Sequence, residues 1–342
     1  MLDGADVVVH PIDPTSPTEA IDEAALPEDF SGVLVSTSGS TRYPKTVMLS
    51  RSALITAAEI AHNRLSGPGH WVNPLPSWYV AGLMTIVRAH IAGQKYRQIP
   101  SDLMLVEPVN PRTYISVVPP QLNRVVSNQD ACARLATFEA VLVGGGPLDQ
   151  SLRLACEDAG IKIVATYGMS ETCGGVVYNG VPLDGVEVEC LADSGRIAIS
   201  TPTVFDGYLG DAVATAEVLD GHRFLTSDRG CWSDGRLQVL SRIDEVVCAG
   251  GINVDLGWIQ QILDQHFPGQ VTCFSVPDPV WGVTIIVASI KPNLSQIKTV
   301  LAGLDSVAQP RGLLALNTLP LSDSGKIDRT ALVERWISGQ RT

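Results

Sequence analysis

The sequence lacks an apolar run long enough to cross a membrane, and its cysteines show no pairing pattern. The apolar stretch from Val283 to Ile290 is far shorter than the roughly 20 residues that a spanning helix needs, so a buried strand is expected there. Seven cysteines show no CxxC pair and no Cys/His ligand spacing. They are expected to be reduced, mostly buried thiols of a cytoplasmic protein. Met1 to His10 lack a basic segment, so no secretory signal peptide is expected.

Positive charge is scarce as well. The chain carries 24 Lys and Arg against 36 Asp and Glu, a formal net charge of −12. This balance argues against nucleic acid or an anionic membrane as a partner. A phosphate-bearing ligand would therefore have to be held by local backbone NH groups and a few basic side chains. The hydrophobic content of 45% is that of a packed globular protein, and 342 residues favour two domains.

Strand-like and helix-like segments alternate in the first half of the chain. Strands are expected at Val33–Val35, Tyr114–Val118, Ala140–Val143 and Ile161–Ala165, with helices over 51–65 and from Pro147 to about Gly160. This alternation predicts a parallel or mixed sheet with helices on its faces. Ligands of such sheets bind at the carboxyl ends of the strands, and the polar loops described below follow predicted strands.

The predicted secondary structure changes after Gly185. Short strands are expected over 196–200, 204–208, 223–225 and 237–240, followed by a compact tail with helices over about 256–266 and 294–304 and strands over 271–276, 283–291 and 312–316. The predicted fold is α/β, or α+β overall. A large N-terminal domain, residues 1–243, has mixed or parallel sheets flanked by helices, and a small mobile α+β domain covers residues 244–342.

Two polar loops could handle a nucleotide. The segment 36–45 places five hydroxyls around one glycine and ends in Lys45, a set of donors that can wrap a polyphosphate. Its spacing is not that of a Walker A loop, and a polar surface turn is the alternative. The segment 165–172 offers an aromatic face in Tyr167 and a hard oxygen ligand for Mg²⁺ in Glu171. The alternative here is a strand-to-helix turn capped by Ser170.

Each of three further segments, taken alone, is a weaker indication of nucleotide binding. In 226–230, Asp228 lies among hydroxyls and suits either a turn or a carboxylate that accepts ribose hydroxyls. In 242–251, Arg242 and Asp244 precede Gly250 and Gly251, and a hairpin with a surface ion pair is the alternative. In 321–329, a Ser-Gly turn presents Lys326, which alone would read as a solvated lysine.

Taken in order, the five segments resemble the adenylate-forming superfamily of acyl-CoA synthetases, peptide-synthetase adenylation domains and luciferases. Residues 37–45 match its phosphate loop, 167–171 its YGxTE block, 226–228 its (T/S)GD block, 241–245 its GRxDD hinge and 324–329 its SGKxxR tail. The resemblance covers about residues 31 to 329. It implies an AMP-forming acid–thiol ligase that uses ATP, Mg²⁺ and coenzyme A, and it leaves a homodimer open.

The resemblance also implies roles for individual residues. The phosphate loop, with Thr37, Ser38, Gly39, Ser40, Thr41 and Lys45, would hold the β- and γ-phosphates. Adenine would lie between Tyr167-Gly168 and the loop formed by Gly144, Gly145, Gly146 and Pro147. Ser170 or Thr172 would contact the α-phosphate, Glu171 would bind Mg²⁺, and Asp228 and Arg242 would fix the ribose.

The remaining implied roles concern the tail. Lys326 would bridge the substrate carboxylate and the α-phosphate in the first half-reaction, because attack of one anion on another requires neutralisation of the developing charge. Asp244 would be the hinge about which the C-terminal domain rotates. Gly250 and Gly251 would then admit the pantetheine arm of coenzyme A, since glycine permits close backbone approach.

Two blocks narrow the expected acid. Residues 75–88 and 116–122 resemble blocks of the o-succinylbenzoate–CoA ligases, and the implied acyl pocket would include Trp78, Tyr79, Gly82, Pro119 and Gly174. The chain departs from the pattern at Arg42, where the loop usually has glycine, and at Trp78-Tyr79, where a histidine pair is usual. A ligase for another aryl or medium-chain acid, a degenerate nucleotide-binding relative and a luciferase-type oxygenase therefore remain as alternatives.

Overall fold

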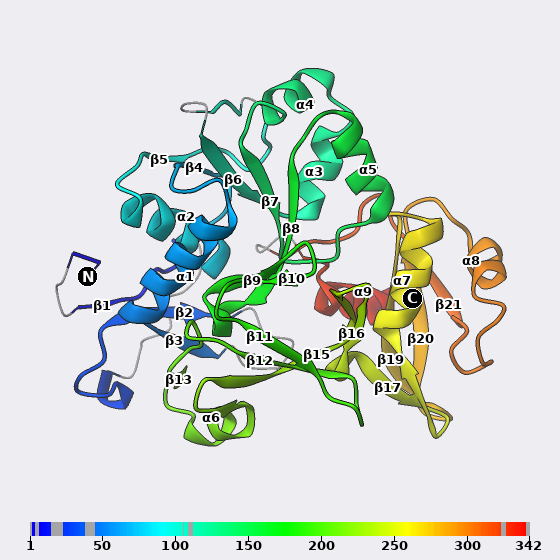
Figure 1. Ribbon diagram of the computed structural model, residues 1–342. Helices are drawn as coiled ribbons and strands as arrows, with labels where there is room; N and C mark the ends of the chain where they lie inside the picture. Colours follow the sequence, from blue (N-terminus) through cyan, green and yellow to red (C-terminus); the bar gives the residue numbers. More distant parts are fainter. Residues whose placement is uncertain are drawn as a thin grey trace.

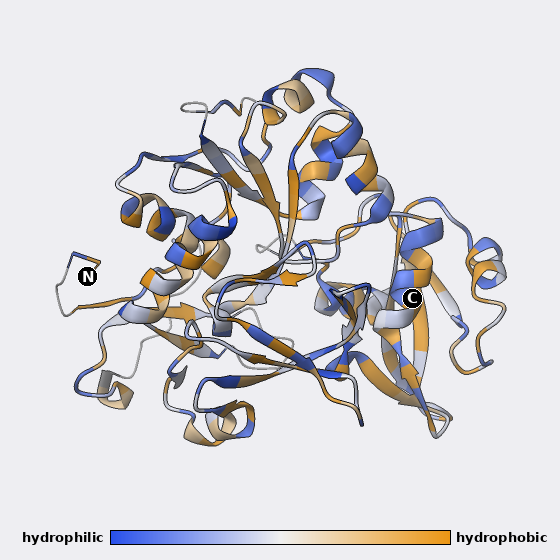
Figure 2. Cartoon of the chain, viewed as in Figure 1, coloured by the Kyte–Doolittle hydropathy of each residue, from blue (hydrophilic) through white to orange (hydrophobic). Residues whose placement is uncertain are grey.

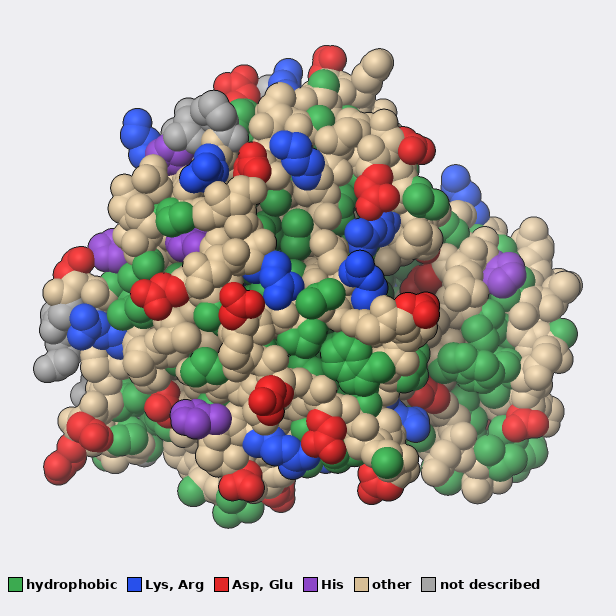
Figure 3. Space-filling view, viewed as in Figure 1, with side chains coloured by type: hydrophobic (Ala, Val, Ile, Leu, Met, Phe, Trp, Pro, Cys, Tyr) green, Lys and Arg blue, Asp and Glu red, His purple; other side chains and the backbone are tan. Residues whose placement is uncertain are grey.

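A computed structural model describes residues 2–3, 7–14, 23–37, 45–104, 106–108, 112–322 and 326–339 (Figure 1). The fold is mixed α/β, as predicted, with several sheets and flanking helices. Within these ranges, no helix is long and apolar enough to cross a membrane. On the face drawn in Figure 3, acidic and basic side chains are interspersed, and the basic ones do not gather into one extended area.

A seven-stranded sheet forms the centre of the larger part of the molecule. Its strands, in spatial order, are β10 (Val181–Pro182), β9 (Gly174–Tyr178), β8 (Ile163–Met169), β7 (Ala140–Val143), β6 (Thr113–Val117), β4 (His70–Asn73) and β5 (Tyr96–Gln98). The strands from β8 to β5 pair in parallel, whereas β9 and β10 are antiparallel additions. The predicted strands at 114–118, 140–143 and 161–165 are confirmed as members of this sheet.

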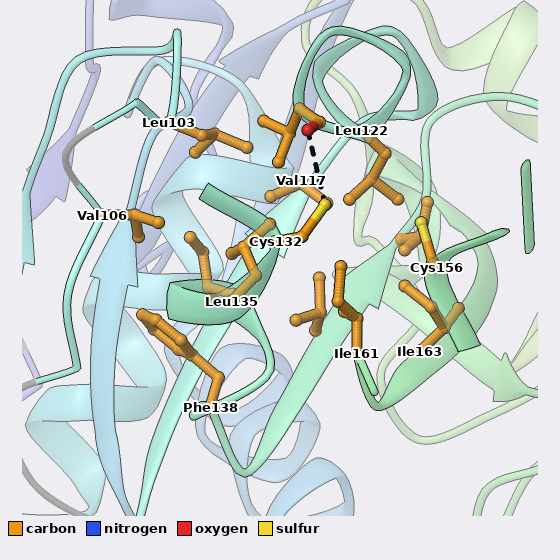
Figure 4. Packing of buried hydrophobic residues seen from close by; sticks show 14 of the residues in the cluster. Leu103, Val106, Val117, Leu122, Cys132, Leu135, Phe138, Cys156, Ile161 and Ile163 are labelled. Carbon is orange, nitrogen blue, oxygen red and sulfur yellow. Dashed lines mark hydrogen bonds between the residues drawn. The ribbon is translucent and has the colours of Figure 1, made fainter. Parts of the chain in front are cut away.

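Helices cover both faces of this sheet, and they are α1 (Arg51–Arg64), α2 (Val80–Ile91), α3 (Pro119–Val125), α4 (Gln129–Leu135) and α5 (Gln150–Asp158). Alternate residues of β7 face opposite sides. Val141 and Val143 pack with α3, α4 and α5, the cluster drawn in Figure 4, whereas Ala140 and Leu142 pack on the side of α1 and α2. β7 is therefore apolar on both faces, which is the pattern of a parallel sheet buried between helical layers. Figure 2 shows hydrophobic residues along the central strands.

A second, four-stranded sheet carries the segment that resembles a phosphate loop. It consists of β1 (Val8–Val9), β2 (Gly32–Ser36), β3 (Thr46–Ser50) and β13 (Gly207–Tyr208). The segment joins β2 and β3 as an antiparallel hairpin closed by Thr37, whose backbone N donates to the Lys45 carbonyl at 2.9 Å. The sequence predicted a strand leading through this loop to a helix, and it missed β3.

A five-stranded antiparallel sheet follows, made of β11 (Glu187–Cys190), β12 (Arg196–Ser200), β14 (Leu219–Asp220), β15 (Arg223–Ser233) and β16 (Arg236–Arg242), with α6 (Ala212–Val218) beside it. The predicted strand over 204–208 is wrong except for its last two residues, Gly207–Tyr208, which form β13. The hydroxyls of Thr201 and Thr203 lie 2.8 Å apart, and Thr203 N donates to Thr201 Oγ1. These local side-chain bonds compete with strand pairing and produce a turn.

The last hundred residues form elements with a hydrophobic core of their own. They are η3 (Ile243–Glu245), β17 (Val246–Ala249), β18 (Ile252–Asp255), α7 (Leu256–His266), β19 (Val271–Asp278), β20 (Gly282–Ser289), α8 (Leu294–Val300), β21 (Gly312–Ala315) and α9 (Arg329–Gly339). Among the described residues, two core clusters involve only positions from 247 onward, and the other three involve only positions up to 237. We refer to residues 246–339 as the C-terminal unit.

Asp264, on α7 of the C-terminal unit, is a source of pH-dependent stability. Burial raises the pKa of its carboxyl to about 6; Asp149 on the larger part adds to the rise, whereas the amide of Gln260 and the charge of Arg329 oppose it. A carboxyl whose folded-state pKa lies above its unfolded value stabilises the fold below about pH 4, and this contribution is lost as the pH rises through 6.

Asp264→Asn is therefore expected to stabilise the C-terminal unit at pH 8 by on the order of 2 kcal/mol and to have no effect near pH 4. The check is thermal unfolding of both proteins at these two pH values. Asp158→Asn, a change at an exposed aspartate of α5, serves as the control. A stability difference that does not change with pH would contradict the raised pKa.

Candidate active site

The carboxyl ends of β7 and β8 form one wall of the candidate site. After β7 the chain runs through Gly144, Gly145 and Gly146. A Cβ at Gly144 would lie 2.5 Å from Thr166 Oγ1, Gly145 has φ of +77°, and a Cβ at Gly146 would meet open space. This loop is therefore a ledge of bare backbone beside β8, and a flat ring could lie against it.

A series of polar contacts joins β8 to Asp244, the predicted hinge residue. Tyr167 donates from its hydroxyl to Oδ2 of Asp228 at 2.8 Å. Arg242 lies between two carboxylates, with Nη1 3.4 Å from Asp228 Oδ1 and with Nε and Nη2 2.8 and 2.7 Å from the two oxygens of Asp244. The predicted ribose residues thus meet, and Arg242 makes a bidentate ion pair with the predicted hinge residue.

Asp228 is the most buried of these four residues, with 7% of its surface exposed. Burial raises the pKa of its carboxyl, and the Tyr167 hydroxyl and the Arg242 charge oppose the rise. Burial, followed by the charge of Asp228, also raises the pKa of Tyr167, so Tyr167 stays a hydrogen-bond donor at every working pH. A carboxylate has about four acceptor sites, so Asp228 keeps capacity for ligand hydroxyls.

The turn after β8 is η2 (Ser170–Thr172), which presents Glu171 and Ser170. Glu171 Oε1 accepts the hydroxyl of Tyr208 at 2.9 Å. Thr172 is fully buried, and its hydroxyl bonds to Met169 and Gly174 within the turn. The structure therefore uses Thr172 to hold the turn and leaves Ser170 as the partly exposed hydroxyl that could contact an α-phosphate.

Lys45 enters the site from the other sheet. Its ammonium lies over the ring of Tyr208, 4.3 Å from the ring centroid. Thr37 follows β2 and faces Lys45 across the hairpin. Its hydroxyl also donates to the Lys45 carbonyl. The four other predicted phosphate-loop residues, Ser38, Gly39, Ser40 and Thr41, lie outside the described residues, as does Arg42.

The charge of Lys326, in the C-terminal unit, acts on several of the same groups. Its pKa is lowered by desolvation first and by the charge of Arg242 second, while the carboxylates of Asp228 and Glu171 act in the opposite direction. The residue keeps an exposed surface, so it sits among protein charges at a place that water and ligands can reach. The segment that carries it is closed by a bridge between Leu321 and Ile327.

Gly250 and Gly251 are not brought into this cluster. They form the turn between β17 and β18 with φ of +59° and +81°, and a Cβ at Gly250 would lie 2.6 Å from the Trp281 ring. Two predicted acyl-pocket residues also have local packing roles. A Cβ at Gly82 would lie 2.1 Å from the Pro76 carbonyl, and Pro119 is the buried first residue of α3. Trp78 and Tyr79 are half-buried just before α2.

Sequence reasoning gave no role to Arg88, a buried cation on α2. Only 4% of its surface is exposed, and its guanidinium lies over the Trp71 ring, 5.1 Å from the centroid. Nε of Arg88, Nε1 of Trp71 and Nε2 of His62 have no hydrogen-bond partner in the described part of the chain. Burial and then the Arg88 charge lower the pKa of His62 to about 4. An arginine inside an apolar helical stretch was the available sequence signal.

Arg88 lies close to the candidate acyl pocket. Its charge reaches Cys173, directly after η2. One helical turn earlier on α2, Met84 Cγ lies 3.7 Å from the position of a Cβ on Gly174. α2 and the start of the 170–175 segment thus pack together beside a buried positive charge, which a carboxylate could neutralise.

The donor set fits ATP with Mg²⁺. Among the described residues, no group of three or more His, Cys, Asp or Glu side chains could form a metal cage. Mg²⁺ on a nucleotide usually takes one or two protein carboxylates together with phosphate oxygens, and Glu171 supplies one such carboxylate. When bound, the ion would neutralise charge that develops on the phosphates. Lys45 and Lys326 supply the protein's own positive charge at the same place.

Comparison with known proteins shows the family to which the chain belongs. Residues 11–209 match the model of the AMP-binding enzyme family. The chain is 37% identical, over an alignment of 332 residues, to a protein of Mycobacterium tuberculosis named probable 2-succinylbenzoate–CoA ligase. The alignment covers 90% of this chain and 85% of that protein. The chain therefore belongs to the AMP-binding enzyme family.

Solved structures agree on the fold. The o-succinylbenzoate CoA synthetase MenE from Bacillus subtilis, in complex with the acyl-adenylate intermediate OSB-AMP, is similar with a TM-score of 0.74 and 22% identity, over 88% of this chain and 68% of that one. The amide bond synthetase McbA from Marinactinospora thermotolerans is similar with a TM-score of 0.76 and 22% identity, over 89% and 69% of the two chains.

Proposed function

We propose that this chain is an AMP-forming acid–CoA ligase whose acyl substrate is o-succinylbenzoate. In the first step a carboxylate oxygen attacks the α-phosphorus of ATP, and pyrophosphate leaves. In the second, the thiol of coenzyme A attacks the acyl carbon, and AMP leaves. The observation that carries the proposal is the hydrogen-bonded network of Tyr167, Asp228 and Arg242, beside which Glu171 and the charge of Lys326 act.

Each charged group has a defined task in this scheme. Asp228 and Arg242 hold the ribose, Lys45 and Glu171 handle the phosphates and the metal ion, and Lys326 neutralises the charge that develops as two anions meet. The presence of Lys326 among these groups disfavours a degenerate relative that only binds nucleotide, since binding alone does not require that lysine. Rotation about Asp244 would then replace Lys326 by the Gly250-Gly251 turn for thioester formation.

Arg88 supports an acid with two carboxylates. One carboxylate must react at the α-phosphate, and a second, on the ring of o-succinylbenzoate, would pair with the buried guanidinium and remove the cost of an uncompensated charge. The name of the Mycobacterium tuberculosis relative points to the same acid. A plain medium-chain acid offers nothing for Arg88 to bind.

The test is acid-dependent ATP–pyrophosphate exchange with a panel that contains o-succinylbenzoate, 4-oxo-4-phenylbutanoate (which lacks the ring carboxylate) and fatty acids. The wild type is expected to prefer o-succinylbenzoate. Arg88→Met should lower kcat/KM for it by about 100-fold, because a buried charged pair is lost, and change that for 4-oxo-4-phenylbutanoate little.

Arg134→Met, on α4 at the opposite face of the sheet, is the matched control and should leave both values unchanged. Faster exchange with a fatty acid than with o-succinylbenzoate would refute the assigned substrate. Equal losses for both aryl acids in Arg88→Met would show that Arg88 supports the fold and does not recognise the second carboxylate.

A further inference from the structure

Tyr208 connects the two side chains that were assigned to the phosphates and to the metal ion. Its hydroxyl donates to Oε1 of Glu171 at 2.9 Å, and the ammonium of Lys45 lies over its ring, 4.3 Å from the centroid. Lys45 ends the hairpin between β2 and β3, whereas Glu171 lies in η2 after β8. One aromatic side chain therefore touches functional groups from segments that adjoin two different sheets.

The backbone fixes the position of Tyr208 independently of these two contacts. The residue is 8% exposed, its ring packs 4.9 Å from the ring of Phe205, and its backbone N donates to Thr215 Oγ1 at 2.9 Å. In β13 it pairs with Val47 of β3. Phe205 N donates to the Glu171 carbonyl at 2.9 Å, so the same segment is bonded to both β3 and the η2 turn.

The chemistry of the contacts is suited to orientation. The Tyr208 hydroxyl is the donor to Glu171, because an ionised carboxylate can only accept hydrogen bonds. Donation to Oε1 fixes the carboxylate and leaves Oε2 for a hard cation. The face of an aromatic ring attracts an ammonium group, which favours one placement of the Lys45 side chain.

From this geometry we infer that Tyr208 is a positioning residue that orients Glu171 for the divalent cation and Lys45 for the phosphates. The inference rests on the proposed function only in requiring that ATP and a divalent cation bind here. Tyr208 itself contacts neither reacting atom. Through it, the metal ligand and the phosphate cation are held at a constant mutual position.

The experiment compares Tyr208→Phe, which removes the hydroxyl and keeps the ring, with Tyr208→Leu, which removes both. Binding of Mn²⁺ in the presence of ATP is followed by electron paramagnetic resonance, and metal-free ATP binding is measured by calorimetry in EDTA. Tyr208→Phe should raise the Mn²⁺ dissociation constant about 10-fold, the effect typical of a lost partner of a metal ligand, and leave metal-free ATP binding unchanged. Tyr208→Leu should in addition weaken metal-free ATP binding about 3-fold.

Tyr114→Phe is the matched control. Tyr114 is a buried tyrosine whose hydroxyl donates to the Gly67 carbonyl on a different part of the molecule, and its variant should match the wild type in both assays. Unchanged Mn²⁺ binding in Tyr208→Phe would overturn the inference, as would equal losses of metal and metal-free ATP binding. If the expected shifts appear but no acid supports exchange, the inference stands and the proposed acyl substrate fails.

Discussion

Lys326→Ala is expected to reduce adenylate formation by a factor of about 10² or more, the loss typical of removing one preorganised donor from developing negative charge. ATP should still bind, because the ledge at 144–146, Asp228 and Lys45 belong to the larger part of the molecule. Thioester formation from a synthetic acyl-adenylate should lose much less, since in the proposed scheme rotation about Asp244 removes Lys326 from the site before that step.

The measurement is single-turnover adenylation and, separately, transfer to coenzyme A starting from the synthetic adenylate. Lys298→Ala, at an exposed lysine on α8 of the same unit, should match the wild type in both steps. Equal losses in the two steps for Lys326→Ala would mean that the lysine is structural or that the two-orientation scheme is wrong.

Asp228→Asn should weaken ATP binding by about 100-fold, because a carboxylate that accepts ligand hydroxyls and faces Arg242 loses its charge. Its effect on the ligand-free protein should have the opposite sign. Burial raises the pKa of Asp228, so ionising it costs stability at neutral pH. An asparagine avoids that cost and can still accept the Tyr167 hydroxyl. The ligand-free variant should therefore melt no lower than the wild type.

Calorimetric titration with ATP and thermal unfolding without it give the two quantities. Asp305→Asn, at an exposed aspartate of the C-terminal unit, is the control and should change neither. A variant that loses stability and ATP affinity together would indicate that Asp228 has a structural role, and that its charge is not kept for the ligand.

The sequence predicted the parallel part of the central sheet because β7 is apolar at every position, β6 is mostly apolar, and both occur between helical stretches. It also predicted that Tyr167, Asp228, Arg242 and Lys326 act together. The structure joins the first three by hydrogen bonds, and the charges of Lys326 and Asp228 influence each other. Their joint action stays a prediction. These residues lie in short ordered blocks, so their chemistry could be recognised without knowledge of the fold.

The other residues of the candidate site could not be predicted, because their roles depend on contacts that only the folded chain forms. Tyr208 is 37 positions from Glu171 along the chain, and no local pattern signals that pair. Arg88 was part of a recognised block, but its burial follows from packing against Trp71. Thr172 looked equivalent to Ser170 in the sequence, and only the turn geometry assigns its hydroxyl to Met169 and Gly174.

The separation of the hydrophobic clusters has a consequence for how the protein is inactivated by heat. The clusters made of positions up to 237 and those made of positions from 247 onward can unfold separately. A single melting temperature therefore does not describe such a chain. Unfolding of the C-terminal unit alone would remove Lys326 and leave the nucleotide ledge intact. Heated enzyme would then retain nucleotide while it no longer makes product, and cooling would restore product formation as long as the larger part had not unfolded.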